Sequence, residues 1–282
     1  MPELPEVETV RARLEPKLVG RRFERVEIFD ERLTRPFDPA RVAAELEGER
    51  VAALDRRGKY LVVRFESGRV LLIHLRMTGN LLHGNGGSDT VGENRHRRAV
   101  VRLDDGSDVV YRDMRRFGTW LLFEADELEP YLGDRVGGDP LAPSFTAKRL
   151  EERLTGRRAP VKAALLDQRK LAGVGNIYAD EALWRARVHP VRPAGELRVA
   201  EVKALHRGIR GALHVGIARQ GATLRTYRTP DGRSGRMQHE FKVYGREGEP
   251  CDRCGTPIEK IRVAGRGTYY CPSCQPRTPP MV

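Results

Sequence analysis

The four cysteines of the chain form two pairs with matched spacing. Cys251 and Cys254 make one Cys-x2-Cys pair, Cys271 and Cys274 make the other, and sixteen residues separate the pairs. Four thiolates arranged in this way can close a tetrahedral zinc site, and thiolate ligands favour zinc or an iron–sulfur cluster. The sequence IEKIRVAGRGTYY between the pairs contains two β-like runs around Ala-Gly-Arg-Gly. We therefore expect one structural zinc ion and a β-hairpin that presents Arg266.

The first residues of the chain combine two prolines and three acids with the start of a helical pattern. In MPELPEVET, Pro2 and Glu3 come directly before apolar residues at spacings of three and four, which predict a helix over 4–19. The helix dipole favours acids at this end by tenths of a kcal/mol, which is a sufficient structural explanation for Glu3 and Glu6. The dipole does not explain the proline at position 2. Chain termini are usually disordered, so a residue that restricts the backbone there needs another explanation.

The stretch LLDQRKLAGVGNIYADEALW, residues 165–184, has the pattern of a helix, a glycine-bearing turn and a second helix. Asn176 stands at the expected N-cap of the second helix, and Asp180 and Glu181 suit its early turns. A helix N-terminus preceded by glycines can hold a phosphate. Taken alone, however, most Gly-x-Gly turns between helices are only turns, and that interpretation is the simpler one.

Three further motifs bring basic, aromatic and thioether side chains to the ends of predicted strands. RRGKY places Lys59 at a strand entry, HLRMTG places Met77 just beyond a strand end, and MRRFGTW joins Arg115 to Phe117 near a strand start. Taken singly, each has an ordinary explanation. Lys59 is then a surface lysine, Met77 and Phe117 are loop residues folded onto the core, and His74 is a structural histidine.

The charge balance indicates a polyanionic partner. Lys and Arg number 51 against 39 Asp and Glu, which gives a net charge of +12 and an isoelectric point near 9.9. Nucleic acid is the first candidate and an anionic membrane the second, while a merely solvated basic surface is the alternative. Hydrophobic residues form 39% of the chain, so a core is expected. No apolar run approaches the ~20 residues that span a bilayer, and the acidic start differs from a secretory signal, so we expect a cytoplasmic protein.

Short β-like runs with turn residues between several of them occupy the first part of the chain. Their close spacing predicts an antiparallel sandwich or barrel. From about residue 146 the pattern is helical. A long amphipathic helix is expected over 199–219, with Gly221 as its C-cap. The strands are expected at 25–28, 51–54, 60–65, 70–75, 99–103, 109–111 and 119–123.

These patterns predict an α+β multidomain chain. The expected parts are an N-terminal β-sandwich domain with an N-terminal helix at 1–134, a Gly- and Pro-rich linker at 135–145, a helical domain at 146–235 and a zinc-stapled hairpin domain at 236–282.

Together these segments resemble the bacterial formamidopyrimidine-DNA glycosylase family, whose members repair oxidised purines, chiefly 8-oxoguanine. The resemblance covers nearly the whole chain and identifies the helical domain as a helix-two-turns-helix domain. The chain opens PELPE, whereas the related endonuclease VIII branch, which prefers oxidised pyrimidines, typically opens PEGPE. The segments that carry the resemblance are, in order, PELPEVET, RRGKYL, HLRMTG, DMRRFG, GVGNIYADEALW, VYGREGEPC and GRGTYYCPSCQ.

The resemblance explains the proline at position 2. Family members lose the initiator methionine, and the secondary amine of the N-terminal proline is the nucleophile. An α-amino group has a pKa of roughly 7.7–8.0, so a useful fraction is neutral near pH 7, whereas a lysine near ~10.4 would need a lowered pKa. Attack at C1′ expels the damaged base and leaves an iminium, which promotes β- and δ-elimination. The resemblance thus implies a bifunctional glycosylase and abasic-site lyase with Pro2 as nucleophile, Glu3 as general acid/base and Glu6 as a supporting residue.

The resemblance also assigns contacts with DNA. A base must leave the stack before it can be processed, at a cost of a few kcal/mol. Met77, Arg115 and Phe117 are implied to fill the vacated space and to touch the orphaned partner base, as apolar wedges commonly do. The loop at 226–238 occupies the place where family members cover the flipped base.

A further set of residues is implied to hold the DNA backbone around the flipped nucleotide. Lys59 and Arg266, which we count with the catalytic residues, and Asn176 should hold phosphates. Lys162 and His96 are weaker candidates for DNA contacts.

Two alternatives stay open on the sequence alone. An endonuclease VIII-like glycosylase for oxidised pyrimidines would share the chemistry. A zinc-dependent DNA-binding protein without catalysis would account for the charge, the cysteines and the helical motif, but not for Pro2 and Glu3 with their surroundings. The expected state is a monomer in a bacterial cytoplasm, associated with the nucleoid. Its partner is double-stranded DNA that contains oxidised purines or abasic sites, and no membrane partner is expected.

Overall fold

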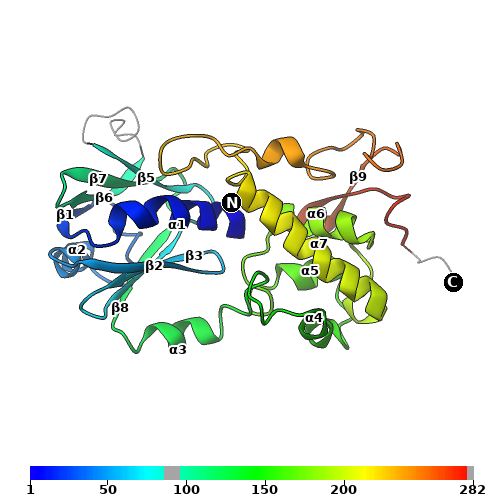
Figure 1. Cartoon of the computed structure of the whole chain (residues 1–282), viewed down its shortest axis with the longest axis horizontal. Coiled ribbons are helices and arrows are strands. Elements are labelled where there is room, and N and C mark those ends of the chain that lie inside the picture. The colour runs from blue at the N-terminus through cyan, green and yellow to red at the C-terminus, as the bar shows by residue number, and fades with distance from the viewer. Residues whose placement is uncertain (86–95, 278–282) are drawn as a thin grey trace. The chain divides into compact units, whose positions relative to one another are not determined.

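The computed structural model describes residues 1–85 and 96–277 of the 282-residue chain (Figure 1). The chain divides into two compact units. The first consists of Met1–Asp134 and Ile217–Gln238, and the second of Arg135–Gly216 and His239–Val282. In the described residues, no helix is both long enough and apolar enough to cross a bilayer.

The first unit contains two four-stranded antiparallel sheets, which confirms the predicted sandwich. One sheet has the strand order β1-β6-β7-β5 and the other has the order β2-β3-β4-β8. The strands of the first sheet are β1 (Phe23–Ile28), β6 (Arg97–Leu103), β7 (Ser107–Asp113) and β5 (Gly79–Asn85). Those of the second are β2 (Val51–Arg57), β3 (Tyr60–Phe65), β4 (Val70–His74) and β8 (Thr119–Phe123).

Three elements of this unit have weak sequence signals and were not predicted. Strand β5, with the sequence GNLLHGN, is interrupted by glycines that hide its alternation. The short helices α2 (Pro39–Leu46) and α3 (Leu128–Gly133) each bury only two apolar side chains, which is too few for a recognisable helical period.

Helix α1 (Leu4–Leu18) fixes the start of the chain to the sandwich. Its apolar face comprises Leu4, Val7, Val10, Leu14 and Leu18, which are at most 3% exposed. The helix lies alongside β2, and most of these side chains join the core that the two sheets enclose (Figure 1). Each such side chain contributes roughly 1.5–3 kcal/mol when fully buried, so the first residues are ordered by the packing of the helix that follows them.

The second unit combines helices with a two-stranded hairpin. Its helices are α4 (Ala147–Leu154), α5 (Val161–Leu166), α6 (Asn176–Ala186) and the main part of α7 (Val199–Ala218), with a 3-10 turn at Ala194–Glu196. A second 3-10 turn, Met237–Glu240, lies where the chain passes between the units. The predicted hairpin is present as β9 (Glu259–Val263) and β10 (Arg266–Tyr270). Its two-residue turn, Ala264–Gly265, has positive φ angles of 48° and 74°, as tight hairpins require.

The N-cap of α6 differs from the prediction by one residue. Gly175, not Asn176, has the extended backbone of an N-cap, and its carbonyl accepts the first helical hydrogen bond, from the Ala179 N–H, at 2.9 Å. Asn176 is therefore the first residue of the helix. Its side chain does not cap α6 and is available for a contact elsewhere.

Candidate active site and metal centre

The N-terminus of the first unit is held by a reciprocal cap. Pro2 is buried, and Glu3 and Glu6 are 3% and 2% exposed. The Glu3 N–H donates to Glu6 Oε2 at 2.8 Å, and the two residues form a capping box at the start of α1. Because the two acids belong to the cap itself, the residue directly before them has a defined position.

Glu6 also joins the N-terminus to the segment that follows α7. Its Oε1 accepts a hydrogen bond from the Ala222 N–H at 2.7 Å. Gly221 has a φ of +76°, and a Cβ at this position would lie 2.7 Å from the Cγ of Glu6. The glycine thus leaves room for the glutamate, a function that the C-cap interpretation of Gly221 did not anticipate. Through Glu6, the base of the predicted covering loop and the N-terminus share one buried carboxylate.

A cleft of about 570 Å³ opens at the N-terminus. Met1, which is 45% exposed, contributes to its lining together with the predicted wedges Met77 and Phe117. The other lining residues are arginines, so the cleft is suited to a polyanion that also offers an apolar surface. These arginines are Arg32, Arg35, Arg76 and Arg116.

Lys59 lies in the tight turn between β2 and β3 and is only 6% exposed. The turn is tied to the N-terminal helix through Arg56, which sequence reasoning missed. Arg56 Nε donates to Glu8 Oε2 at 2.8 Å, and its Nη1 donates to the Gly58 carbonyl at 3.2 Å. Lys59 is therefore not an ordinary surface lysine, because its turn is held against α1.

His74 ends β4 and is 7% exposed. Its Nδ1 accepts a hydrogen bond from the Arg76 N–H at 2.9 Å, and its ring packs edge-on against Tyr60 with centroids 4.6 Å apart. Burial, with the nearby charges of Arg76 and Lys59, lowers the pKa of His74 to about 3. The neutral ring thus orders the turn that presents Met77, in agreement with a structural role.

The lowered pKa of His74 predicts a pH dependence of stability. Between about pH 6.5 and pH 3 the unfolded chain binds more protons at this histidine than the folded one, so acidification should destabilise the first unit. The slope should approach about 1.4 kcal/mol per pH unit. In His74→Asn, Oδ1 can replace Nδ1 as acceptor. The free energies of unfolding measured with denaturant at pH 6.5 and 5.5 should differ less in this variant than in the wild type. An unchanged difference would mean that other groups dominate.

The loop between β7 and β8 presents Arg115 and Phe117. Phe117 is 51% exposed, and the Arg115 guanidinium lies 4.7 Å from the centroid of its ring. The next arginine anchors the loop, because Arg116 makes a bidentate pair with Asp30 at 2.7 and 2.8 Å. That guanidinium lowers the pKa of the Asp30 carboxyl. His96, the remaining DNA candidate of this unit, is half-buried, and its carbonyl accepts from the Asp113 N–H at 3.0 Å.

The four cysteine sulfurs of the second unit lie within 4.8 Å of one another. Sulfur–sulfur distances of 3.5 Å for Cys254–Cys271 and 3.9 Å for Cys251–Cys274 bracket the ~3.8 Å that a tetrahedron with Zn–S bonds of about 2.3 Å requires. The Trp184 Nε1–H donates to Cys251 Sγ at 3.4 Å, so an N–H from α6 supports one ligand. These residues fit one structural zinc ion.

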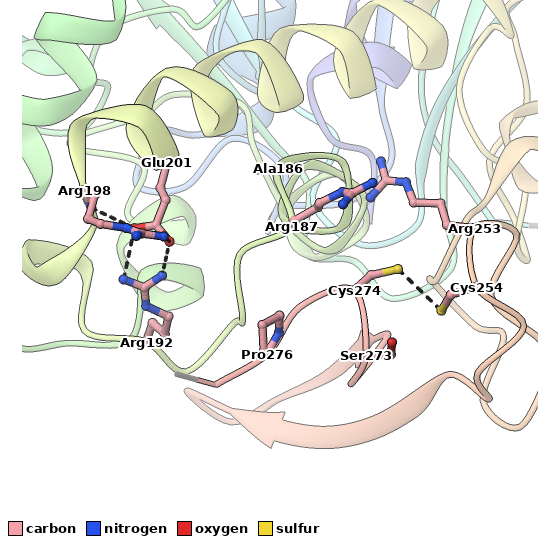
Figure 2. A pocket seen from close by; sticks show the side chains of 10 residues that line it. All are labelled: Ala186, Arg187, Arg192, Arg198, Glu201, Arg253, Cys254, Ser273, Cys274 and Pro276. Carbon is pink, nitrogen blue, oxygen red and sulfur yellow. Dashed lines mark hydrogen bonds and ion pairs between the residues drawn. The ribbon is translucent and has the colours of Figure 1, made fainter. Parts of the chain in front are cut away.

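A cleft of about 540 Å³ borders the exposed side of this sulfur cluster (Figure 2). Arg187 and Arg253 point toward each other on the α6 side, and Arg253 stacks 3.6 Å from the Trp184 ring centroid. Neither has a carboxylate partner in the part of the chain that is described, whereas Arg192 and Arg198 share Glu201. Because four thiolates around Zn²⁺ carry two net negative charges, the arginine pair is best explained as their electrostatic complement.

Asn176 and Arg266 are brought together by one carbonyl group of the hairpin. Asn176 Nδ2 donates to the Gly267 carbonyl at 3.0 Å, and the neighbouring Arg266 is exposed. The same carbonyl accepts from Lys162 Nζ at 3.1 Å. The start of α6 is therefore in direct contact with the hairpin next to Arg266.

The structure does not support the predicted contact of Lys162 with a phosphate. This side chain is 0% exposed and lies 2.7 Å from Asp180 Oδ1 and 2.8 Å from Thr268 Oγ1. Burial raises the pKa of Asp180 to about 7 against the opposing effect of Lys162. The buried Lys162–Asp180 pair fixes the hairpin to α5 and α6, and the hairpin contacts of Lys162 are with Gly267 and Thr268.

Asp180 and Glu181 anchor the zinc-bearing segment to α6, which sequence reasoning missed. The Tyr269 N–H donates to Asp180 Oδ2 at 3.0 Å. Glu181 is 0% exposed and accepts from three consecutive N–H groups, those of Lys242, Val243 and Tyr244, at 2.9–3.1 Å. The sequence pattern indicates only that the two acids suit the early turns of the helix. The only available signal was their position in an otherwise apolar helix.

Sequence comparisons identify the relatives of this chain. Family models match "Formamidopyrimidine-DNA glycosylase N-terminal domain" at residues 1–120, "Formamidopyrimidine-DNA glycosylase H2TH domain" at 136–228 and "Zinc finger found in FPG and IleRS" at 248–277. A formamidopyrimidine-DNA glycosylase of Symbiobacterium thermophilum is 49% identical over 98% of this chain and 90% of its own length. One of Roseiflexus sp. is 46% identical over 98% of this chain and 100% of its own.

Solved structures agree with these relatives. A Lactococcus lactis FPG mutant in complex with Fapy-dG-containing DNA superposes with a TM-score of 0.90 at 37% identity, covering 98% of this chain and 100% of that one. The Lactococcus lactis Fpg bound to abasic-site DNA gives the same TM-score and identity over 97% of this chain and 99% of its own. The chain therefore belongs to the formamidopyrimidine-DNA glycosylase family.

Proposed function

We propose that this protein is a base-excision-repair enzyme that removes oxidised purines from double-stranded DNA and then cleaves the abasic site. The observation that carries the proposal is the capped N-terminus, which holds Pro2 directly after Met1, a residue that lines a cleft with Met77 and Phe117. The relatives named above are formamidopyrimidine-DNA glycosylases, and the similar structures hold Fapy-dG or abasic-site DNA.

The chemical step follows from a free secondary amine at Pro2. Removal of Met1 exposes this amine, which attacks C1′ of the damaged nucleotide, so that the C1′–N bond breaks and the base leaves with the bonding electrons. Glu3 is proposed to transfer protons at the sugar as its ring opens. The resulting iminium draws electrons from the sugar, and loss of a proton from C2′ expels the 3′ phosphate. A second elimination then releases the 5′ phosphate.

Base release requires the nucleotide to be outside the helix. We propose that Met77, Arg115 and Phe117 occupy the space that the base vacates, and that residues 226–238 cover the flipped base. An exposed phenylalanine beneath an arginine offers a stacking surface together with a hydrogen-bond donor, a combination that suits an orphaned base.

The backbone of the flipped nucleotide needs cationic and amide donors. We assign this role to Lys59 in the first unit and to Asn176 and Arg266 in the second, with His96 as a weaker candidate. A zinc ion bound by Cys251, Cys254, Cys271 and Cys274 would be structural, because the four protein thiolates leave no open coordination position. Its effect on DNA is therefore indirect, through the hairpin that carries Arg266.

The assignment of Arg266 is tested by salt titration. Arg266→Ala should weaken binding to lesion DNA and lower the slope of log K against log salt by about one unit, because one phosphate contact is lost. Arg262→Ala is the matched control, since Arg262 is an exposed arginine of the same hairpin, on the opposite strand. Equal affinity of Arg266→Ala and the wild type at two salt concentrations would remove the phosphate role.

Oxidised pyrimidines are the second candidate substrate. The wild-type Lactococcus lactis FPG has been crystallised with DNA that contains an oxidised pyrimidine, and that chain is 36% identical to this one. Single-turnover product analysis on matched duplexes, with 8-oxoguanine in one and dihydrothymine in the other, separates the two. We expect faster release of the purine, and faster release of the pyrimidine would reassign the substrate.

We propose a monomer with a catalytic domain at 1–134, a linker at 135–145, a helix-two-turns-helix domain at 146–235 and a zinc-finger domain at 236–282. Its place of action is the nucleoid of a bacterial cytoplasm, where its DNA substrate lies.

A further inference from the structure

One buried carboxylate connects the two turns that carry the proposed wedges. Asp113 is the last residue of β7 and is 1% exposed. Its Oδ1 accepts hydrogen bonds from the Thr78 hydroxyl and, at 3.2 Å, from the Arg115 N–H. Its Oδ2 accepts from the Phe117 N–H at 2.9 Å and from the Gly118 N–H at 2.8 Å. Thr78 directly follows Met77, so both wedge-bearing turns converge on one side chain.

These hydrogen bonds orient the turns. The Thr78 hydroxyl oxygen also accepts from the Arg115 N–H at 3.0 Å, which closes a three-membered network with Asp113. Within the described residues the Asp113 carboxylate has no ion pair, so its charge is balanced by neutral donors that point at it from the two loops. Hydrogen bonds to an ionised carboxylate are roughly twice as strong as neutral ones. Three of these come from backbone N–H groups of the loop after β7, and the fourth comes from the Thr78 hydroxyl of the other turn.

The glycines of both turns pack closely against the side chain of Tyr111. A Cβ on Gly118 would lie 1.6 Å from the Tyr111 hydroxyl, and a Cβ on Gly79 would lie 2.4 Å from the same atom. Tyr111 belongs to β7, is fully buried and stands two residues before Asp113. Both turns are therefore packed onto one strand, and their orientation is set by that strand.

The wedge side chains themselves cannot supply this orientation. Phe117 is 51% exposed and Arg115 lies on its ring, so neither is fixed by core packing. Entry into a DNA stack nevertheless requires defined geometry, because a displacement of about 1 Å can cost on the order of 10²-fold in rate. The orientation must then come from contacts of the loop backbone, and the Asp113 carboxylate makes such contacts.

We propose that Asp113 is the positioning residue for lesion recognition, and that it holds Met77, Arg115 and Phe117 in the arrangement that flips the base and reads its partner. This inference rests on the proposed glycosylase function. Asp113 touches neither the sugar nor the base in this scheme, and its contribution passes through the two turns. Its loss should therefore affect steps that need the wedges and spare steps that do not.

The test compares Asp113→Asn with Asp108→Asn. Asp108 lies in the same strand, is 5% exposed and pairs with Arg102, away from the wedge turns. In Asp113→Asn the side-chain NH₂ faces backbone donors, so the network cannot be complete. We expect single-turnover release of 8-oxoguanine opposite cytosine to slow by about 10- to 100-fold. The ratio of rates opposite cytosine and opposite adenine should move toward one.

Single-stranded abasic DNA supplies the discriminating readout. It has no stack to open and no partner base to read, so borohydride trapping on this substrate should stay within about twofold of wild type for Asp113→Asn. Asp108→Asn should resemble the wild type in every assay. Wild-type rates and opposite-base ratio for Asp113→Asn would overturn the inference. An equal loss on single-stranded abasic DNA in a folded Asp113→Asn protein would also overturn it, because the effect would then not depend on the wedges.

A second variant keeps the test decisive if Asp113→Asn is unstable. Thr78→Val removes one hydroxyl from the network while preserving the shape of the side chain, and it should shift the opposite-base ratio in the same direction by a smaller factor. An unchanged ratio in a folded Thr78→Val protein would count against the proposal. If the wild-type protein releases no base and forms no adduct with either DNA, the proposed function itself fails, which is a separate result.

Discussion

Pro2→Gly is expected to slow base release by about 10²-fold or more and to leave the affinity for lesion DNA unchanged. The variant retains a terminal amine, but it loses the ring that fixes the direction of the nitrogen, and misplacement of a nucleophile by about 1 Å costs on the order of 10²-fold. Glycine at this position also adds backbone freedom next to the Glu3–Glu6 cap. Pro2 is not a proposed phosphate contact, so binding should persist.

The measurement is single-turnover release of 8-oxoguanine together with a binding isotherm on the same duplex. Pro16→Ala is the matched control, since Pro16 is an exposed proline of the same helix, remote from the terminus. Mass spectrometry must first establish that Met1 is absent from each sample, because a retained methionine blocks the amine. Wild-type base release by Pro2→Gly would place the nucleophile elsewhere. Loss of base release in Pro2→Gly with unchanged affinity for the duplex would reject the non-catalytic alternative.

Zinc removal should have the second large effect, confined to one part of the chain. Structural zinc contributes on the order of 10–16 kcal/mol in small modules. Without the metal, no ion joins the four closely spaced cysteine sulfurs, and the hairpin that carries Arg266 should lose its order. Lesion-DNA affinity should fall at least about tenfold, since a charge-assisted hydrogen bond contributes about 1.5–3 kcal/mol.

Hydrogen exchange after chelation locates the effect. Amides of roughly the last 40 residues, including those of Lys242 to Tyr244 that bind Glu181, should lose protection. The strands of the first unit should keep theirs, and readdition of zinc should restore both protection and binding. A stripped protein with full activity and unchanged exchange would show that the hairpin does not depend on the metal.

The parts of the fold that could be predicted are those with a regular period. Helix α1 and the strand β3 follow from residue spacing alone, and the cysteine spacing predicts the metal site that the sulfur geometry fits. Elements such as β5 were missed, because their signal is interrupted by glycine and depends on strands that pair with them from elsewhere in the chain.

The side chains that organise the candidate site were harder to predict, for a physical reason. Glu181 accepts from N–H groups about 60 residues further along the chain, and Lys162 meets the hairpin about 105 residues away. Local patterns contain no information about such partners, so Lys162 was assigned to a phosphate and Glu181 to a helix dipole. Asp113 lay inside a motif that was recognised, but its network exists only after two turns meet on β7.

Borohydride trapping tests the central claim most directly. The purified protein is mixed with a duplex that contains 8-oxoguanine opposite cytosine, borohydride is added, and the residue joined to DNA is mapped by mass spectrometry. The proposed mechanism predicts a covalent adduct at the nitrogen of Pro2, because reduction converts the iminium into a stable amine. An adduct at a lysine would contradict the assignment of the nucleophile. The absence of any adduct, with Pro2 confirmed as the first residue and DNA binding intact, would contradict amine catalysis on this lesion.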